Sequence, residues 1–229
     1  MSTASDLSNL TWTAVPEGAT VLVPLGSTEQ HGPHLPFATD AIVAAAVAHA
    51  AAQRLNAAGD PTIVAPVLPY GASGEHQAFA GTVSIGHEAL RAVLIEIVRS
   101  LATWASRIII VNGHGGNAPT VNAVVDQMRF EGHELLCVMC AAESSTDAHA
   151  GFDETSIMLQ IQPNLVDVDA IAPGNTQPLG EILADLMEHG VRPVSPNGVL
   201  GNPRSASAEI GDRLLAEMVA RVVEVARGR

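Results

Sequence analysis

The residues with the clearest potential for chemistry lie at positions 26–40, which read G-S-T-E-Q-H-G-P-H-L-P-F-A-T-D. Glu29 and His31 are two positions apart, and alternate residues of an extended segment project from the same face, so both side chains can reach one ion. Asp40 stands where a helix is expected to begin. There its carboxylate can cap free backbone N–H groups or bind a cation. We interpret the stretch as a metal site; the alternative is a polar turn capped by Asp40.

A fourth candidate ligand, His114, follows the clearest strand pattern in the chain. Residues 107–111 (R-I-I-I-V) predict a buried strand that leads directly into N-G-H-G-G-N. Residues 20–24 (T-V-L-V-P) lead into the first stretch in the same way. Ligands of an open α/β sheet bind beyond the carboxyl ends of its strands, so His114 is expected beside Glu29 and His31. The alternative is a histidine that serves only the turn.

Two further segments add titratable residues. The glycine-rich segment 68–84 contains Glu75 and His76, which either line the site or form a solvated loop pair. Residues 147–156 (D-A-H-A-G-F-D-E-T-S) place His149, Asp153 and Glu154 at one junction before an expected helix. Both segments are therefore candidates to complete the site.

Together these residues predict a pair of metal ions. The candidate ligands are Glu29, His31, Asp40, His114 and one of the acids near Ser156. Mixed carboxylate and imidazole donors suit Zn, Mn or Fe, whereas Ca or Mg would favour oxygen alone. So many ligands exceed the need of one tetrahedral ion. They suit two ions that share a bridging carboxylate, expected to be Asp40, with a hydroxide between them as nucleophile for amide hydrolysis.

The elements that must position these groups alternate along the chain. Apolar runs predict strands over residues 20–24, 62–66, 107–111 and 134–140. Helices are expected over residues 40–56, 87–104, 155–162, 179–188 and 208–227, with another that ends near residue 130. This alternation indicates one α/β domain over residues 1–229.

The composition excludes several functions. The formal net charge is −13 and the 11 basic residues are all arginine, which argues against DNA or RNA as a partner. Without lysine the chain can form neither a Schiff base nor a phosphate loop. A secretory signal is not evident and the apolar stretch from residue 41 is too short to span a bilayer, so we expect a soluble, cytoplasmic protein. The pair Cys137 and Cys140 is interpreted as structural thiols, with a redox or zinc pair as the alternative.

Five ordered motifs resemble those of the creatininase (creatinine amidohydrolase) family over nearly the full length of the chain. They are S-T-E-Q-H-G-P-H-L-P with the following Thr39-Asp40, G-E-H-Q-A-F-A-G-T, N-G-H-G-G-N, H-A-G-F-D-E-T-S and G-V-L-G-N-P-R-S-A-S. The resemblance implies a three-layer α/β/α sandwich with a mostly parallel central sheet, a binuclear metal site, hydrolysis of a non-standard amide, and homo-oligomers that are often hexamers. By motif, it implies that the metal ligands are Glu29, His31, Asp40 and His114 and that His149 is catalytic.

The chain departs from the family pattern at two positions. Creatininase has a glutamate two residues after the motif histidine, where this chain has Gly116, and we expect Glu154 to supply the missing ligand. The acidic residue that precedes the catalytic histidine in creatininase is Ala148 here. These departures argue against creatinine as the substrate and leave the hydrolytic core intact.

Within the family, the compact, lysine-free chain is most similar to the branch of the mycofactocin system. That branch is a peptidase that trims a C-terminal Val-Tyr dipeptide from a modified precursor peptide, so the resemblance implies a small modified peptide as substrate. In the expected reaction a metal-bound hydroxide attacks the scissile carbonyl, the second ion and His149 stabilise the oxyanion, and His149 or Glu154 passes a proton to the leaving amine. The candidates for substrate binding are His34, Glu75, His76 and Arg204.

Several alternatives stay open. Arg204 could pair with a substrate carboxylate, but a loop or subunit contact is the favoured interpretation. A formamide or cyclic-amide hydrolase of the same family, acting in flavin or deazaflavin biosynthesis, would use the same ligands. A non-catalytic metal-binding scaffold that works through oligomerisation is the alternative from another class.

Overall fold

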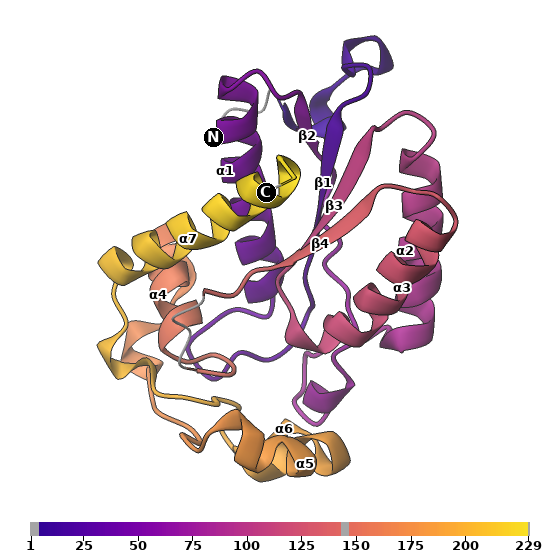
Figure 1. Cartoon of the computed structure of the whole chain (residues 1–229). Coiled ribbons are helices and arrows are strands. Elements are labelled where there is room, and N and C mark those ends of the chain that lie inside the picture. Colours follow the sequence, from indigo (N-terminus) through magenta and orange to yellow (C-terminus); the bar gives the residue numbers. More distant parts are fainter. Residues whose placement is uncertain (1–4, 143–146, 229) are drawn as a thin grey trace.

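A parallel sheet lies at the centre of the part of the chain that the structure describes (Figure 1). The structure is a computed structural model that describes residues 5–142 and 147–228. The strands are β1 (Thr20–Leu25), β2 (Thr62–Val64), β3 (Arg107–Asn112) and β4 (Leu135–Met139), in the order β2-β1-β3-β4. Each pair of neighbouring strands is parallel. The strands therefore send their carboxyl ends to one edge of the sheet.

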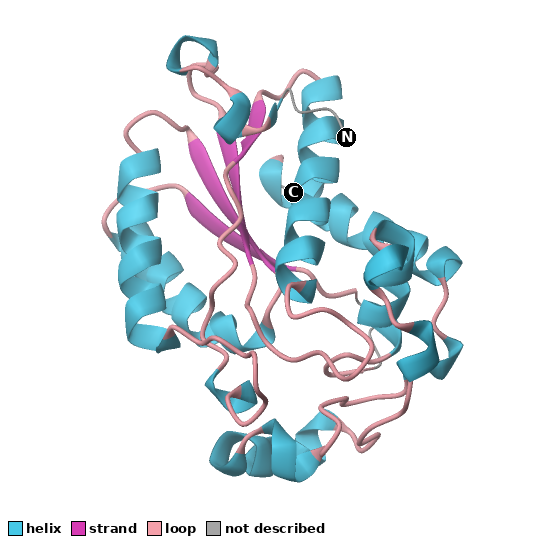
Figure 2. Ribbon diagram, turned by 180° about the vertical axis from the view of Figure 1, so that it is seen from behind, coloured by secondary structure: helices cyan, strands magenta, loops and turns pink. Residues whose placement is uncertain are grey.

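Helices cover both faces of this sheet (Figures 1 and 2). The first face carries α1 (Thr39–Ala57), α4 (Phe152–Ile161) and α7 (Ala208–Ala226), and the opposite face carries α2 (Gly86–Leu101) and α3 (Ala118–Phe130). Each helical layer shares its own apolar cluster with the sheet. The three-layer α/β/α sandwich expected from the sequence is confirmed.

The strands are apolar on both faces because both faces are covered. Leu22 and Ile109 point into the cluster shared with α1 and α7. Their chain neighbours Val21 and Ile108 point into the cluster shared with α2 and α3. None of the four is more than 2% exposed. Continuous Val/Ile/Leu runs, rather than alternating ones, are therefore what this sheet requires.

The carboxyl ends of β1 and β3 form the edge that positions the candidate site. These strands are neighbours, and Leu25 pairs with Asn112 where they end. The chain leaves β1 for β2 through α1 on one face, but leaves β3 for β4 through α3 on the other. Such a reversal opens a crevice in which ligands bind. Beyond this edge lie α5 (Leu179–His189) and α6 (Val191–Val194), in contact with the short 3-10 helix Gly74–His76.

Two helix boundaries differ from the expectation. The helix expected over residues 155–162 begins at Phe152, so Asp153 and Glu154 lie on its first turn, where acidic side chains suit the helix dipole. The helix expected over residues 87–104 already ends at Leu101. Among the described helices, none combines the length and the apolar character that crossing a membrane requires.

Candidate metal centre and active site

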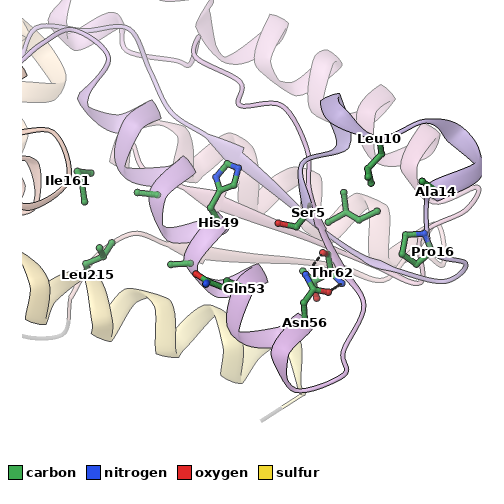
Figure 3. A pocket seen from close by; sticks show the side chains of 13 residues that line it. Ser5, Leu10, Ala14, Pro16, His49, Gln53, Asn56, Thr62, Ile161 and Leu215 are labelled. Carbon is green, nitrogen blue, oxygen red and sulfur yellow. Dashed lines mark hydrogen bonds between the residues drawn. The ribbon is translucent and has the colours of Figure 1, made fainter. Parts of the chain in front are cut away.

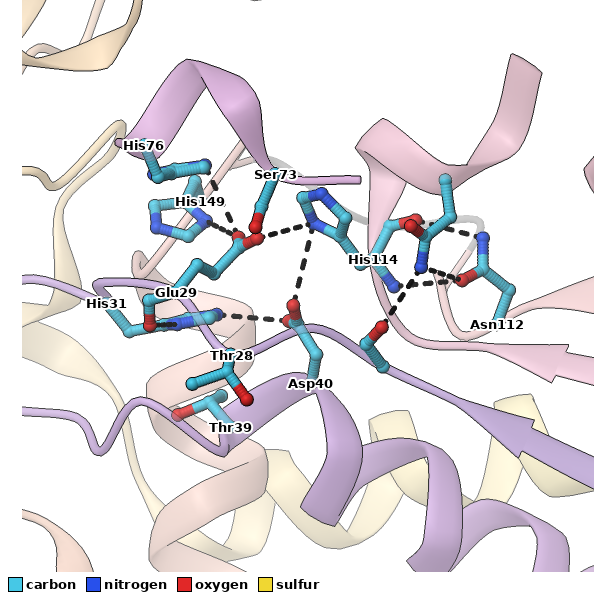
Figure 4. Close-up of polar contacts among 12 residues, drawn as sticks. Thr28, Glu29, His31, Thr39, Asp40, Ser73, His76, Asn112, His114 and His149 are labelled. Atoms are coloured by element: carbon cyan, nitrogen blue, oxygen red, sulfur yellow. Dashed lines mark hydrogen bonds and ion pairs between the residues drawn. The ribbon is translucent and has the colours of Figure 1, made fainter. Parts of the chain in front are cut away.

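Asp40 projects its carboxylate from the first turn of α1 into the crevice (Figure 4). The N-cap of α1 is Ala38, and within the described part of the chain this end of the helix has no side-chain cap hydrogen bond. Asp40 Oδ1 lies 3.0 Å from His31 Nε2, and Oδ2 lies 3.5 Å from His114 Nδ1. Of the two roles that the sequence left open for Asp40, the tertiary structure therefore disfavours helix capping.

The first ligand group consists of Glu29, Asp40 and His114. One atom from each residue lies within 4.8 Å of the other two. His114 Nδ1 lies 3.1 Å from Glu29 Oε2. Glu29 comes from the segment after β1 and His114 from the loop after β3, so two neighbouring strands deliver them to the same point (Figure 4).

The second ligand group consists of His31, Asp40 and Glu154, again with ligand atoms within 4.8 Å of one another. His31 Nε2 lies 3.9 Å from Glu154 Oε2. The Glu154 carboxylate also accepts the N–H of Ala150 at 2.6 Å, which holds it at the start of α4. The two groups share Asp40, which directs one oxygen towards each imidazole.

The buried carboxylates indicate that this cluster is built for cations. Glu29 Oε1 and Oε2 and Asp40 Oδ2 make no hydrogen bond among the described residues, although both side chains are at most 2% exposed. Their neighbours are imidazole nitrogens 3.1–3.5 Å away, within ion-pair distance. Buried charges are costly unless they are paired or coordinate a metal. The mixed oxygen and nitrogen donors suit Zn, Mn or Fe. The residues thus fit divalent ions held by the two ligand groups.

Contacts behind the two imidazoles orient them towards the cluster. His31 Nδ1 lies 3.1 Å from the backbone oxygen of Glu29, which can only accept, so Nε2 faces the cluster. His114 has the opposite arrangement: Nε2 lies 3.2 Å from the oxygen of Ala72 and 3.4 Å from Glu75 Oε1, so Nδ1 faces the cluster. Partners of this kind set the ring orientation and the tautomer of metal-binding histidines.

In the absence of a cation, the neighbouring carboxylates raise the pKa values of the His31 and His114 imidazoles. Burial opposes protonation of His31, but Asp40, Glu154 and Glu29 outweigh it and raise its pKa to about 10. Burial likewise opposes protonation of His114. Its pKa is nevertheless raised, and Glu29 contributes more to this than any other charged group. Burial raises the pKa of Glu154 to about 7. Because a ligand imidazole must be neutral, divalent ions compete with protons for these nitrogens.

Two asparagines hold the loops around His114. Asn112 Nδ2 donates to the backbone oxygen of His114 at 2.9 Å. Asn117 is fully buried, accepts the N–H of Ala72 at 2.8 Å and donates to the oxygen of Gly26 at 3.1 Å. One side chain therefore ties together the segments that follow β1, β2 and β3. The only signal in the sequence for this role was the place of both asparagines in N-G-H-G-G-N.

His149 forms a third group with Glu29 and His31. Its Nδ1 lies 3.7 Å from Glu29 Oε1, and its ring centroid lies 4.4 Å from that of His31. Its backbone exchanges two hydrogen bonds with Leu200. The G-V-L-G motif near the C-terminus therefore places this histidine beside the metal-ligand candidates.

Glu75 and His76, two of the candidates for substrate binding, lie against the ligand groups. Glu75 Oε1 contacts His114 Nε2 as described above, and His76 Nε2 lies 3.3 Å from Glu29 Oε1. Both residues belong to the 3-10 helix Gly74–His76. Their contacts are with ligand side chains, which suits a role in orienting them.

His34 and Arg204, the other two candidates, do not belong to the ligand groups. His34 is 1% exposed and forms a 2.8 Å hydrogen bond between Nε2 and Thr155 Oγ1, which links the first motif to α4. Arg204 is exposed on the 3-10 helix Pro203–Ser205. Sequence reasoning also passed over Gln30, which lies between Glu29 and His31 and contacts both His76 and His149.

A cavity of about 160 Å³ opens beside the cluster. Asp40, His149 and Glu154 contribute polar groups to its wall. Asp147 and Asp153 also line it, together with apolar and sulfur-containing side chains that include Met139, Cys140 and Met218. This space reaches the ligand groups at Asp40, which both groups share, and at Glu154.

A larger hollow of about 340 Å³ lies along α1 and the N-terminal 3-10 turns (Figure 3). Its wall includes none of the candidate ligands. His49 within it has local partners, since Nδ1 donates to the oxygen of Ala45 at 2.7 Å and Nε2 lies 3.3 Å from Asp6 Oδ1. This hollow is therefore separate from the metal centre.

Cys137 and Cys140 are free thiols. Burial raises the pKa of Cys137 to about 12 and raises that of Cys140 as well. Both therefore stay protonated at neutral pH, whereas redox and zinc-binding cysteines react as thiolates. The structure agrees with their interpretation as structural thiols.

Comparisons with known proteins agree with this architecture. The sequence model of the creatininase family, described as creatinine amidohydrolase, matches residues 8–226. The chain is 49% identical to a protein of Mycobacterium ulcerans (strain Agy99) named mycofactocin precursor peptide peptidase, over 95% of this chain and 86% of that protein. A crystal structure from Bacteroides fragilis NCTC 9343, provisionally named a creatinine amidohydrolase, matches with a TM-score of 0.83 and 26% identity over 99% of this chain and 96% of that one. A structure described as creatininase Mn matches with a TM-score of 0.78 and 26% identity over 98% of each chain.

The fold and the site together define a hydrolase that acts on amide bonds. The chain belongs to the creatininase family. Solved creatininase structures include forms described as Mn and as Zn-Zn, and the present chain carries a candidate metal-binding cluster.

Proposed function

We propose that this protein is a metal-dependent peptidase that removes the C-terminal Val-Tyr dipeptide from a modified mycofactocin precursor peptide. The similarity to the mycobacterial relative named mycofactocin precursor peptide peptidase supports the substrate class. The observation that carries the proposal is the meeting of two ligand groups at Asp40, whose buried carboxylate lacks full hydrogen bonding. Two divalent ions, Zn, Fe or Mn, would be held by Glu29, Asp40 and His114 and by His31, Asp40 and Glu154.

Ions bound at this position would polarise the scissile carbonyl and would also lower the pKa of a bound water to near neutrality. The side chains of the protein then handle the protons. His149 Nδ1, directed at the cluster, accepts a proton from the attacking water and passes it to the leaving amine. Glu154, whose Oε2 lies 3.9 Å from His31 Nε2, is the second group proposed to carry this proton. Both residues lie beside the 160 Å³ cavity.

The proposal extends to assembly and location. We propose a cytoplasmic homo-oligomer, hexameric if it follows the family. Trp12, Phe130 and Met187 are each more than 80% exposed, which suits subunit contacts. Arg204 would then serve either a subunit contact or the terminal carboxylate of the peptide. Size-exclusion chromatography with light scattering measures the oligomer directly, and a monomer at micromolar concentration would remove this part of the proposal.

Mass spectrometry of reaction products tests the function. The protein, loaded in turn with Zn, Mn and Fe(II), is incubated with a precursor peptide ending in Val-Tyr, in modified and unmodified form. We expect release of the dipeptide, and loss of release after chelation. His114→Gln should lose metal and turnover together. His189→Gln is the matched control, because this ring is 54% exposed at the end of α5 and should leave both unchanged.

Other outcomes would replace the proposal. An intact peptide in every metal state, together with turnover of a formamide or a cyclic amide, would assign the chain to that activity. Metal binding without turnover of any of these substrates would favour a non-catalytic metal-binding scaffold that works through oligomerisation.

A further inference from the structure

The side-chain amide of Gln30 is held between two backbone groups. Its Oε1 accepts the N–H of Gly32 at 2.9 Å, and its Nε2 donates to the oxygen of Gly198 at 3.0 Å. An N–H must face an acceptor and a carbonyl must face a donor, so these partners decide which end of the amide carries the oxygen. Gly198 has φ +83°, and a Cβ at this position would collide with Gln30 Oε1. Glycine at 198 is therefore part of this arrangement.

The same amide reaches His76. Gln30 Nε2 lies 2.9 Å from His76 Nδ1. Because the amide nitrogen only donates, this ring nitrogen accepts, and the proton of a neutral His76 lies on Nε2. That nitrogen lies 3.3 Å from Glu29 Oε1 and points at the carboxylate (Figure 4).

The backbone of Gln30 fixes a second ring. His149 Nε2 lies 2.7 Å from the backbone oxygen of Gln30, an atom that can only accept. His149 Nε2 also lies 3.1 Å from Gln30 Nε2, but the two hydrogens of that amide serve His76 Nδ1 and the oxygen of Gly198, which are closer. Nε2 of His149 therefore carries the proton, and Nδ1 offers its lone pair towards Glu29 Oε1, 3.7 Å away. The rings of His31 and His76 both have centroids 4.4 Å from that of His149, so rotation of this ring is restricted.

We propose that Gln30 is a positioning residue that sets the tautomers of His149 and His76 through its backbone oxygen and its side-chain amide, respectively. This inference rests on the proposed hydrolytic function and specifies the direction of the first proton transfer at His149. His149 begins the reaction as a proton acceptor at Nδ1, and it donates only a proton that it has first accepted. His76 presents an N–H to Glu29, which orients this ligand.

Long-range ¹H–¹⁵N NMR spectra of the metal-free full-length protein, with labelled histidine, test the proposal without metal or substrate. In the wild type we expect the Nε2–H tautomer at both His149 and His76. Gln30→Met keeps the side-chain length but removes the amide. In this variant the Nδ1 resonance of His76 should move to that of a nitrogen without a hydrogen bond. His149 should keep its Nε2–H tautomer, because the backbone oxygen of residue 30 remains.

The tautomer of His149 therefore serves as the control for the change at His76. An Nδ1–H tautomer at either ring of the wild type would overturn the proposal, even if the variant fails to fold. So would a His76 spectrum that Gln30→Met leaves unchanged. In the metal-loaded enzyme we expect the same variant to lower kcat about 10-fold with KM retained, the lower range for loss of an outer partner of a metal site. If the NMR spectra show the predicted tautomers but the protein does not cleave the peptide, the proposed function is refuted and the inference about the tautomers stands.

Discussion

The carboxylate of Glu75 occupies the space beside Gly116 that a side chain at this position would need. A Cβ on residue 116 would lie 2.5 Å from Glu75 Oε1 and 2.8 Å from the oxygen of Ala72, and it would also collide with His114 Nε2. At the position where creatininase has a glutamate, this chain therefore has a glycine, and the carboxylate of Glu75 from another loop lies next to it. That acid contacts the outer nitrogen of His114.

Gly116→Ala should weaken metal binding without unfolding the protein. The added methyl group must displace Glu75, the ring of His114 and the backbone at Ala72. Outer partners of metal-bound histidines are worth about 10- to 100-fold in affinity. Isothermal titration with Zn measures the change. Gly115→Ala is the matched control, because a Cβ there meets no heavy atom within 4 Å. Equal affinities for both variants would contradict the packing described here.

Asp40→Asn should remove the response of stability to metal. Asp40 belongs to both ligand groups, so its loss affects both sites at once. A ligand that binds only the folded state at 100 times its Kd adds about 2.7 kcal/mol to the unfolding free energy. Thermal unfolding with and without Zn should show a clear increase in Tm for the wild type and almost none for the variant. A full increase in the variant would show that Asp40 is not a shared ligand.

His34 should make the metal-free protein less stable in acid. Burial first, and then the charge of His31, lower the pKa of His34 to about 4. Between pH 6.5 and pH 4 the unfolded chain therefore takes up a proton that the folded protein refuses, and stability falls as pH falls. Integrated over this window, the loss amounts to about 3 kcal/mol.

Urea unfolding across this pH range compares wild type with His34→Gln, which retains a partner for Thr155. The variant should lose less stability on acidification, whereas His189→Gln should follow the wild type. Parallel curves for His34→Gln and wild type would contradict the assignment.

Asn117→Ala should destabilise the fold by about 2–4 kcal/mol. The side chain is fully buried, and its loss leaves the N–H of Ala72 and the oxygen of Gly26 without their partners. Urea denaturation at neutral pH measures the change. Asn202→Ala is a useful comparison because Asn202 is exposed and only accepts the N–H of Arg204. A loss below about 0.5 kcal/mol for Asn117→Ala would show that the three loops are held by other contacts.

Much of the fold could be predicted from the sequence because its signals are local. The runs that became β1 and β3 are Val- and Ile-rich over their whole length, as strands covered on both faces must be. The boundary of α4 could not be predicted in this way. Its first turn depends on Gly151 as N-cap and on the Glu154 carboxylate, which binds the N–H of Ala150.

By itself, the sequence determined the α/β class and pointed to Glu29, His31 and His114, since strand ends deliver residues to one edge. Only the tertiary structure decided how Asp40 faces the cluster, how close Glu154 lies to His31, and which ring nitrogens face inward. These features depend on loops that are distant in the chain and meet at one point. The contact of Gln30 with Gly198 is such a case, because hydrogen bonds between remote segments leave no periodic pattern in the sequence.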